Sequence, residues 1–155
     1  MTGTSSRSPQ RRPAFSLLEV LIFLVILGTL TAIALPRMKR DSSQRRVEAA
    51  AFAVTADVEA AFSLAARGRR PMRLTYNASS GELRAADRTA GTVHRRRPLR
   101  SSSEFQLDSV AMTPATVDFY PNGVATAGFT IAMKNGAHER RVVVTRTGLT
   151  RVVVP

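Results

Sequence analysis

The stretch that decides the fold is residues 15–35, FSLLEVLIFLVILGTLTAIAL, an apolar run with one ionisable side chain, Glu19. At about 1.5 Å per residue, a helix of these 21 residues matches the hydrocarbon core of a bilayer, which is about 30 Å thick. A carboxylate is costly inside such a run and marks a functional site. We therefore expect one membrane-spanning helix, in which Glu19 has a specific role.

The residues before this run are basic and include no acidic residue, with positive charges at Arg7, Arg11 and Arg12. This bias favours a cytoplasmic N-terminus, although basic residues after the run compete with it. An ordinary secretory signal has a core of about 7 to 15 residues and then a small-residue cleavage site, and neither feature is present here. An uncleaved anchor would explain the length of the run but not Glu19.

The string Ala14-Phe15-Ser16-Leu17-Leu18-Glu19 resembles the prepilin signal of type IV pilins and pseudopilins, whose usual form is Gly-Phe-Thr-Leu-Ile-Glu before an apolar helix. The resemblance implies cleavage between Ala14 and Phe15 by a prepilin peptidase, which would remove residues 1–14 as a leader. It also implies methylation of the new amino group of Phe15. Glu19 would then guide assembly by pairing with that amino group in a neighbouring subunit.

Pro36 closes the apolar run, and proline removes a backbone donor and clashes one turn back. We expect a helix break at Pro36, with a bend or frayed stretch over residues 32–36; a simple helix end at the membrane surface is the alternative.

The helix is expected to resume as an amphipathic segment within residues 36–68 and to end at Gly68. Its apolar stripe is Val47, Ala51, Val54, Val58, Phe62 and Ala65. Three acidic residues lie off this stripe and are expected to face solvent: Glu48, Asp57 and Glu59.

Residues 69–155 show short β-rich segments separated by turn residues. Strands are expected at 72–76, 82–85, 105–110, 116–120, 124–133, 140–145 and 149–154, with 86–103 left as a longer basic segment. Two Asn-Gly pairs, at 122–123 and 135–136, predict tight hairpins whose two central residues both have positive φ. The predicted fold is α+β and pilin-like: a long N-terminal helix, half transmembrane and half amphipathic, packed on mainly antiparallel β-sheet.

The string Phe119-Tyr120-Pro121-Asn122-Gly123, with the strands after it, resembles the end of the H-type minor pseudopilins of type II secretion. The FimT-like minor pilins share this domain. The resemblance implies a structural subunit of a periplasmic pseudopilus, near its tip, anchored in the bacterial inner membrane by one helix with its head in the periplasm. Its partners would be other pseudopilins or pilins and the prepilin peptidase/methyltransferase. The alternative is a FimT-like minor type IV pilin that takes part in pilus assembly or DNA uptake.

From the residues alone, Phe119 is expected in the core, Tyr120 at a half-buried edge and the next three residues in a turn.

The sequence offers no catalytic motif, and it contains no cysteine. His94 and His138 are expected in a basic loop and beside a turn, without partners at metal-ligand spacing. Ser101 to Ser103 form a polar, loop-like cluster. We expect no enzyme activity, no cofactor and no metal.

The formal net charge of +12 attracts polyanions. Two arginine-rich segments are candidate contacts for a polyanion such as DNA: Arg67, Arg69 and Arg70, and Arg95, Arg96 and Arg97. Charged runs are more often solvated faces or loops, and no aromatic residue interleaves with these arginines to stack on bases.

Overall fold

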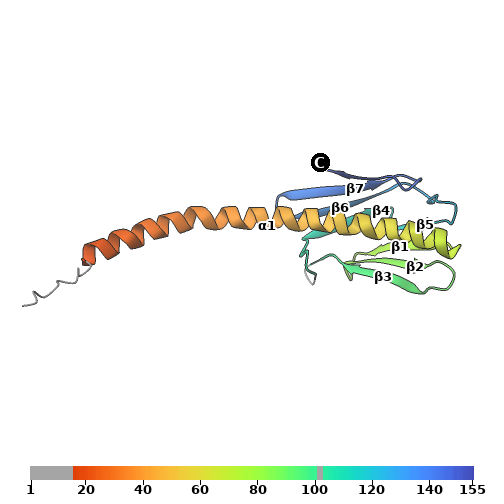
Figure 1. Cartoon of the computed structure of the whole chain (residues 1–155), viewed down its shortest axis with the longest axis horizontal. Helices are drawn as coiled ribbons and strands as arrows, with labels where there is room; N and C mark the ends of the chain where they lie inside the picture. The colour runs from red at the N-terminus through yellow and green to blue at the C-terminus, as the bar shows by residue number, and fades with distance from the viewer. Residues whose placement is uncertain (1–15, 101–102) are drawn as a thin grey trace, which may run out of the picture. The chain divides into compact units, whose positions relative to one another are not determined.

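The computed structural model describes residues 16–100 and 103–155, without the side chains of residues 33–41. The predicted cleavage site, Ala14 and Phe15, lies outside the described residues. The chain divides into two compact units, Met1–Met38 and Lys39–Pro155, the second of which we call the head. The elements are labelled in Figure 1 and are one helix, α1 (Leu17–Gly68), and the strands β1 (Met72–Asn77), β2 (Glu82–Asp87), β3 (Val93–Pro98), β4 (Ser109–Thr113), β5 (Thr116–Phe119), β6 (Phe129–Asn135), β7 (His138–Val144) and β8 (Thr150–Val153).

Helix α1 is continuous from Leu17 to Gly68, so the break expected at Pro36 is not seen as an interruption of the helix. Proline already has a helical φ, and it removes only one backbone hydrogen bond, so the hydrogen bonds on either side keep the helical path. The helix ends at Gly68, as the sequence predicted. Arg69 follows in the left-handed region with φ of 49°, a common conformation directly after a helix end, and Pro71 prevents further helix.

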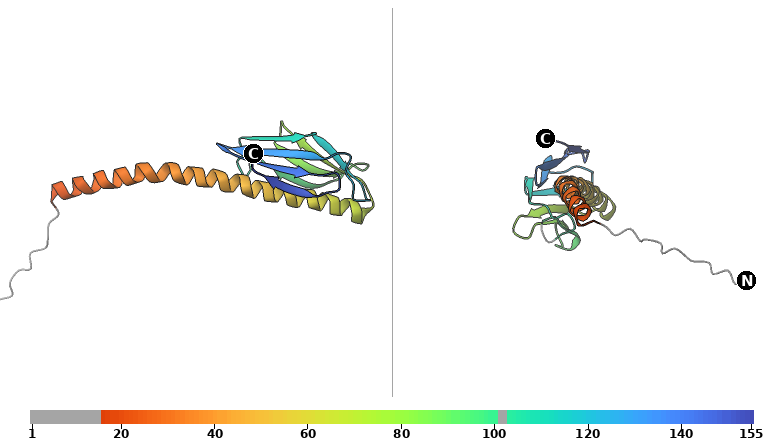
Figure 2. Two further views of the ribbon diagram at one scale, coloured as in Figure 1. Left: turned by 90° about the horizontal axis from the view of Figure 1, so that it is seen from above. Right: turned by 90° about the vertical axis from the view of Figure 1, so that its left-hand side faces the viewer.

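The head contains two four-stranded antiparallel sheets, in the orders β3-β2-β1-β5 and β4-β6-β7-β8. In Figure 2 both sheets lie on one side of the C-terminal part of α1. This confirms the α+β class and the packing of the helix on antiparallel sheet.

The face of α1 that the sheets bury is wider than the predicted stripe. Ala50, Asp57 and Ala61 are buried in addition to that stripe, because two sheets contact the helix rather than one. Asp57 is only 2% exposed, so the expectation that it faces solvent was wrong. Phe119 lies at the centre of the core, stacked on Phe62 of the helix with ring centroids 4.2 Å apart.

The strands differ from the sequence prediction in three places. β3 lies in the basic segment that was left unassigned, and it places His94 on a strand rather than in a loop. β4 begins later than the expected strand at 105–110, and β6 begins at Phe129 rather than at residue 124.

The two Asn-Gly hairpins were also predicted with the wrong backbone. In each pair only the glycine, Gly123 or Gly136, has positive φ. Asn135 is instead the last residue of β6, where its buried side-chain amide donates to the Gln106 carbonyl over 2.7 Å. The amide is thus needed to satisfy a loop carbonyl, and Gly136 alone supplies the turn conformation.

An ion-pair network fastens the first sheet at Asp118 on β5. Arg73 on β1 donates two hydrogen bonds to this carboxylate, over 2.7 and 3.0 Å, and Arg88 lies 3.2 Å away. Arg88 also donates to the Tyr120 hydroxyl over 3.2 Å. Asp118 is 7% exposed, and its hydrogen bonds from Arg73 lower the pKa of its carboxyl below the usual 3.8.

Replacing Phe119 tests the assignment of the core. Phe119→Ala should destabilise the head by about 3 to 5 kcal/mol, because it removes a fully buried ring and leaves a cavity between helix and sheets. Urea unfolding followed by circular dichroism measures this change. Phe52→Ala, on the same helix but with a ring that is 72% exposed, is the matched control and should stay within about 0.5 kcal/mol of the parent. Equal losses in the two variants would contradict the described core.

Asp118 should make stability depend on pH. Because its folded pKa is lowered, its contribution is present above the unfolded value and is lost as the pH falls through the folded value. Asp118→Asn should cost about 1 to 2 kcal/mol at pH 7, since the guanidinium of Arg73 is partly exposed. That cost should shrink as the pH falls through the lowered folded pKa of Asp118, as measured by urea unfolding across the acidic pH range. Glu59→Gln, at an exposed carboxylate on α1, is the control. A cost for Asp118→Asn that does not vary with pH would contradict the role of the ion pair.

Candidate functional site

Glu19 lies in the first turn of α1, exposed among apolar side chains. The large apolar side chains around it are all exposed, from Leu17 at 83% to Val20 at 46%. The hydroxyls of Thr29 and Thr31 donate to helix carbonyls over 2.8 and 2.7 Å, which satisfies their polar groups within the segment. Glu19 has no hydrogen bond or ion pair with any residue that the structure describes.

Two parts of α1 must be compared as membrane segments. By length and composition alone, Ser42–Gly68 is long and apolar enough to span a membrane. However, Val47, Val54 and Val58 within it are fully buried against the sheets, so its apolar character is that of a core helix. Leu17–Ala32 is a shorter apolar stretch, and in the sequence the apolar run continues to Leu35. Its exposed apolar surface makes it the better candidate for the bilayer.

Arg95 and Arg97, two of the six predicted polyanion contacts, bind within the head. Both guanidinium groups pair with the buried carboxylate of Asp57 on α1, and Nη2 of Arg97 donates to Oδ1 over 3.0 Å. The hydrogen bonds to Asp57 raise the pKa of Arg97 above its usual value. These two arginines therefore join β3 to the helix, and the carboxylate of Asp57 balances part of their combined charge.

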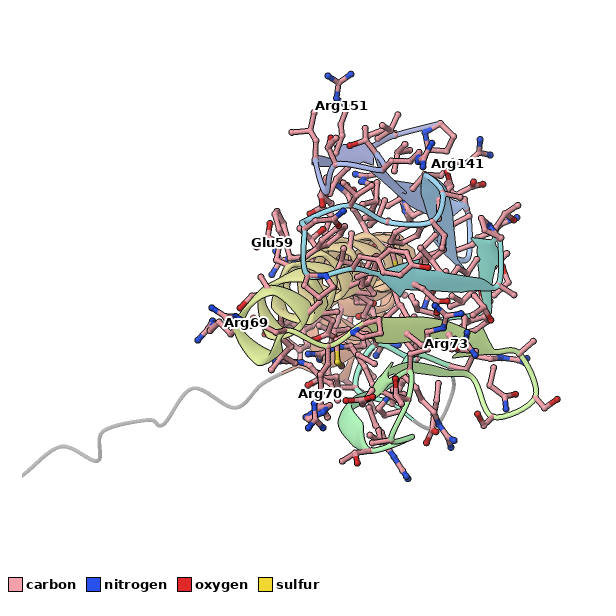
Figure 3. All side chains as sticks on the ribbon, turned by 90° about the vertical axis from the view of Figure 1, so that its right-hand side faces the viewer. Glu59, Arg69, Arg70, Arg73, Arg141 and Arg151 are labelled. Atoms are coloured by element: carbon pink, nitrogen blue, oxygen red, sulfur yellow. The ribbon has the colours of Figure 1, made fainter. Side chains whose placement is uncertain are left out.

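The other four candidates do not gather into one surface with this pair. Arg96 is exposed on β3, where the alternation of a strand turns it away from its two neighbours. Arg69 and Arg70 extend into solvent at the end of the helix in Figure 3, and Arg70 lies 3.8 Å from Asp87. Arg67 donates to the Ser63 hydroxyl over 2.5 and 3.1 Å.

A cavity of about 420 Å³ brings Arg67 and Arg70 together with His94 at this end of the head. The buried carboxylate of Asp87 lines the same cavity. Asp87 accepts backbone hydrogen bonds from Thr89 and Ala90 over 2.7 and 2.8 Å, which together with Arg70 lower the pKa of its carboxyl. The negative charge of Asp87 and the nearby C-terminal end of α1 both oppose binding of an anion in this cavity.

Sequence reasoning missed one further contact between helix and sheet. Glu48 accepts hydrogen bonds from Gln44 over 3.2 Å and from Arg140 on β7 over 2.8 Å. These two bonds lower the pKa of the Glu48 carboxyl. Glu48 and Asp57 thus tie the helix to one sheet each, and the only signal in the sequence was a pair of acids beside an apolar stripe.

Among residues 16–100 and 103–155, no group of three histidine, cysteine or acidic side chains is placed to hold a metal ion. His94 is exposed and His138 is half-buried at the start of β7.

Comparisons with known proteins identify the family of this chain and solved structures with a similar fold. Residues 50–148 match the family model of the type II transport protein GspH. The minor pseudopilin EpsH from the type 2 secretion system of Vibrio cholerae has a similar structure, with a TM-score of 0.56 and 13% identity over 71% of this chain and 98% of that chain.

Two crystal structures of the type IV minor pilin FimU from Pseudomonas aeruginosa are similar to the same extent. Both have a TM-score of 0.55; one is 17% identical over 68% of this chain and 91% of FimU, the other 19% identical over 72% and 90%. These likenesses show the fold. No curated protein matches the sequence. Because the family match spans more than half of its length, this chain belongs to the GspH family of type II transport proteins and is a minor pseudopilin or pilin.

Proposed function

We propose that the chain is a minor pseudopilin, a structural subunit near the tip of the periplasmic pseudopilus of a type II protein secretion system. The observation that carries the proposal is the exposed apolar start of α1, where Glu19 pairs with none of the described residues, on a chain whose head belongs to the GspH family. A soluble protein does not leave an apolar helix of this length uncovered. Bilayer lipid before assembly, and the helices of other subunits afterwards, would cover it. The chain then acts through assembly and not as an enzyme.

Glu19 would fix the position of each subunit in the filament. A prepilin peptidase cuts before Phe15 and leaves a free amino group, which the same enzyme methylates without removing its positive charge. At 4 Å and an effective dielectric of about 20, opposite unit charges attract by about 4 kcal/mol. The amino group of Phe15 in a neighbouring subunit, one helical step away, would pair with the carboxylate. The attraction therefore sets the axial register of the apolar helices.

Before assembly, residues 15–35 would cross the bacterial inner membrane once. The basic leader holds the N-terminus in the cytoplasm, where the peptidase acts, and the head lies in the periplasm. Pro36 then stands at the boundary between the membrane segment and the head. One missing backbone hydrogen bond makes it the place where the helix yields when a subunit leaves the bilayer.

The second candidate is a FimT-like minor pilin of a type IV pilus. The FimU structures favour it as strongly as EpsH favours the first, since their TM-scores are 0.55 and 0.56. DNA binding through the arginine-rich segments belongs to this candidate. The case for DNA binding is weaker because two of the six candidate arginines, Arg95 and Arg97, pair with Asp57 inside the head. The genes beside this one decide between the candidates: secretion genes favour the first and pilus genes the second.

Replacing Glu19 tests the proposed role in assembly. Glu19→Ala should leave membrane insertion intact, because the change makes the segment more apolar, but should reduce recovery of the chain in isolated filaments at least about tenfold. A tenfold loss corresponds to only about 1.4 kcal/mol, a third of the attraction estimated above. Quantitative immunoblotting of filament and membrane fractions measures both effects. Glu59→Ala removes an exposed carboxylate from the head part of the same helix, and it should assemble normally. Normal recovery of Glu19→Ala in filaments would contradict the pairing.

A further inference from the structure

The two sheets end in outer strands of opposite character. β3, at the edge of the first sheet, carries Arg95, Arg96 and Arg97 and ends at Pro98, and such residues protect an edge from pairing with another strand. β8, at the edge of the second sheet, has the sequence TRVV and pairs with β7 alone. With two adjacent valines and one charged residue, β8 is less protected than β3 and is a site at which another strand can add.

The register of β8 shows which of its backbone groups are open. The Thr145 N–H donates to the Leu149 carbonyl over 3.0 Å, and the pairing continues with Val143 opposite Arg151. Bonded and non-bonded pairs alternate in an antiparallel ladder, so Arg151 and Val153 bond to β7. The backbone N–H and C=O of Thr150 and Val152 therefore point away from the sheet. Within the described part of the chain, no backbone group of another strand meets them.

Apolar side chains lie on both faces of the sheet along this edge. Val152, opposite the buried Val142, is 41% exposed, and Val154 just beyond the strand is 64% exposed. Val153 and Val143 share the other face with Arg151 and are 36% and 37% exposed, and Leu149 just before the strand is 65% exposed. Arg151 is the one charged residue of β8; it extends into solvent in Figure 3 and has no ion pair with a described residue.

We propose that β8 is a docking edge for an extended segment of a different filament subunit, which adds as a fifth strand and carries a carboxylate opposite Arg151. The charge argues for a partner of this chemistry. A second copy of the processed chain, which has a net charge of +9 once the three arginines of residues 1–14 are removed from +12, would bring like charges together, whereas an acidic strand would neutralise Arg151. Main-chain hydrogen bonds to Thr150 and Val152 would supply affinity, and apolar side chains would cover Val153 and Val154. The inference rests on the proposed function, because it requires neighbouring subunits.

The test uses photo-crosslinking of the full chain in its own host. A benzophenone amino acid at Val154 should yield one major cross-link to another subunit. Mass spectrometry identifies the cross-linked segment, and its sequence should be acidic and show the alternation of a β-strand. Val152→Pro removes the outward N–H without touching the bonds to β7, and it should reduce the cross-link at least about tenfold. Val152→Thr keeps the N–H and the β-branched shape and should cross-link like the parent.

The charge is tested by a matched pair of reversals. Arg151→Glu should reduce the cross-link severalfold, whereas Arg96→Glu, the same change on the protected edge β3, should leave it unchanged. Thermal unfolding shows whether Val152→Pro still folds. If it does not, the two charge reversals decide the outcome.

A second crosslinker position separates this inference from the proposed function. Leu24, exposed in the apolar segment, reports assembly whatever happens at β8. Cross-links from Leu24 with none from Val154, or cross-links from Val154 only to a second copy of the chain, would overturn the docking edge and leave the proposed function standing. So would a cross-link from Val154 that survives a folded Val152→Pro. If neither position cross-links, the proposed function fails and the docking edge fails with it.

Discussion

The head depends on the burial of the C-terminal part of α1 against two sheets. Each sheet has one apolar face, and neither face is covered without the helix. Val47, Val54 and Val58 fill this contact, and Phe62 stacks on Phe119. The same helix begins with exposed apolar side chains around Glu19. One helix thus contributes core residues to the head in its C-terminal part and exposed apolar side chains in its N-terminal part.

Three acids, of which Asp57 and Asp118 are buried and Glu48 is partly exposed, hold several of the arginines of this basic chain. Asp57 on the helix binds Arg95 and Arg97 of the first sheet, Glu48 binds Arg140 of the second, and Asp118 joins strands within the first. Breaking such a pair leaves an uncompensated charge at a partly buried position, which is more costly than the pair itself is stabilising. The arginines in these pairs therefore join strands to the helix or to one another. Charges without an ion pair among the described residues, such as Arg151, are the better indicators of a binding surface.

The sequence was sufficient for several features that a local pattern determines, although the backbone of the two Asn-Gly pairs was predicted wrongly. The helix end at Gly68, the turn at Pro121 to Gly123 and the buried Phe119 follow from residue types and spacing within a few positions. It was insufficient where a partner distant in the chain decides the outcome. The arginines of β3 look like a solvated loop until Asp57, some 40 residues earlier, is placed beside them. The position of β8 at the edge of its sheet likewise depends on the order of the strands, which a local sequence pattern does not determine.

We propose that the chain works as a processed subunit inside a filament. The most direct test is the intact mass of the protein recovered from isolated filaments. We expect the mass of residues 15–155 with one methyl group on Phe15, and no unprocessed chain in that fraction. A chain of residues 1–155 confined to the membrane fraction, with none in the filaments, would contradict the account.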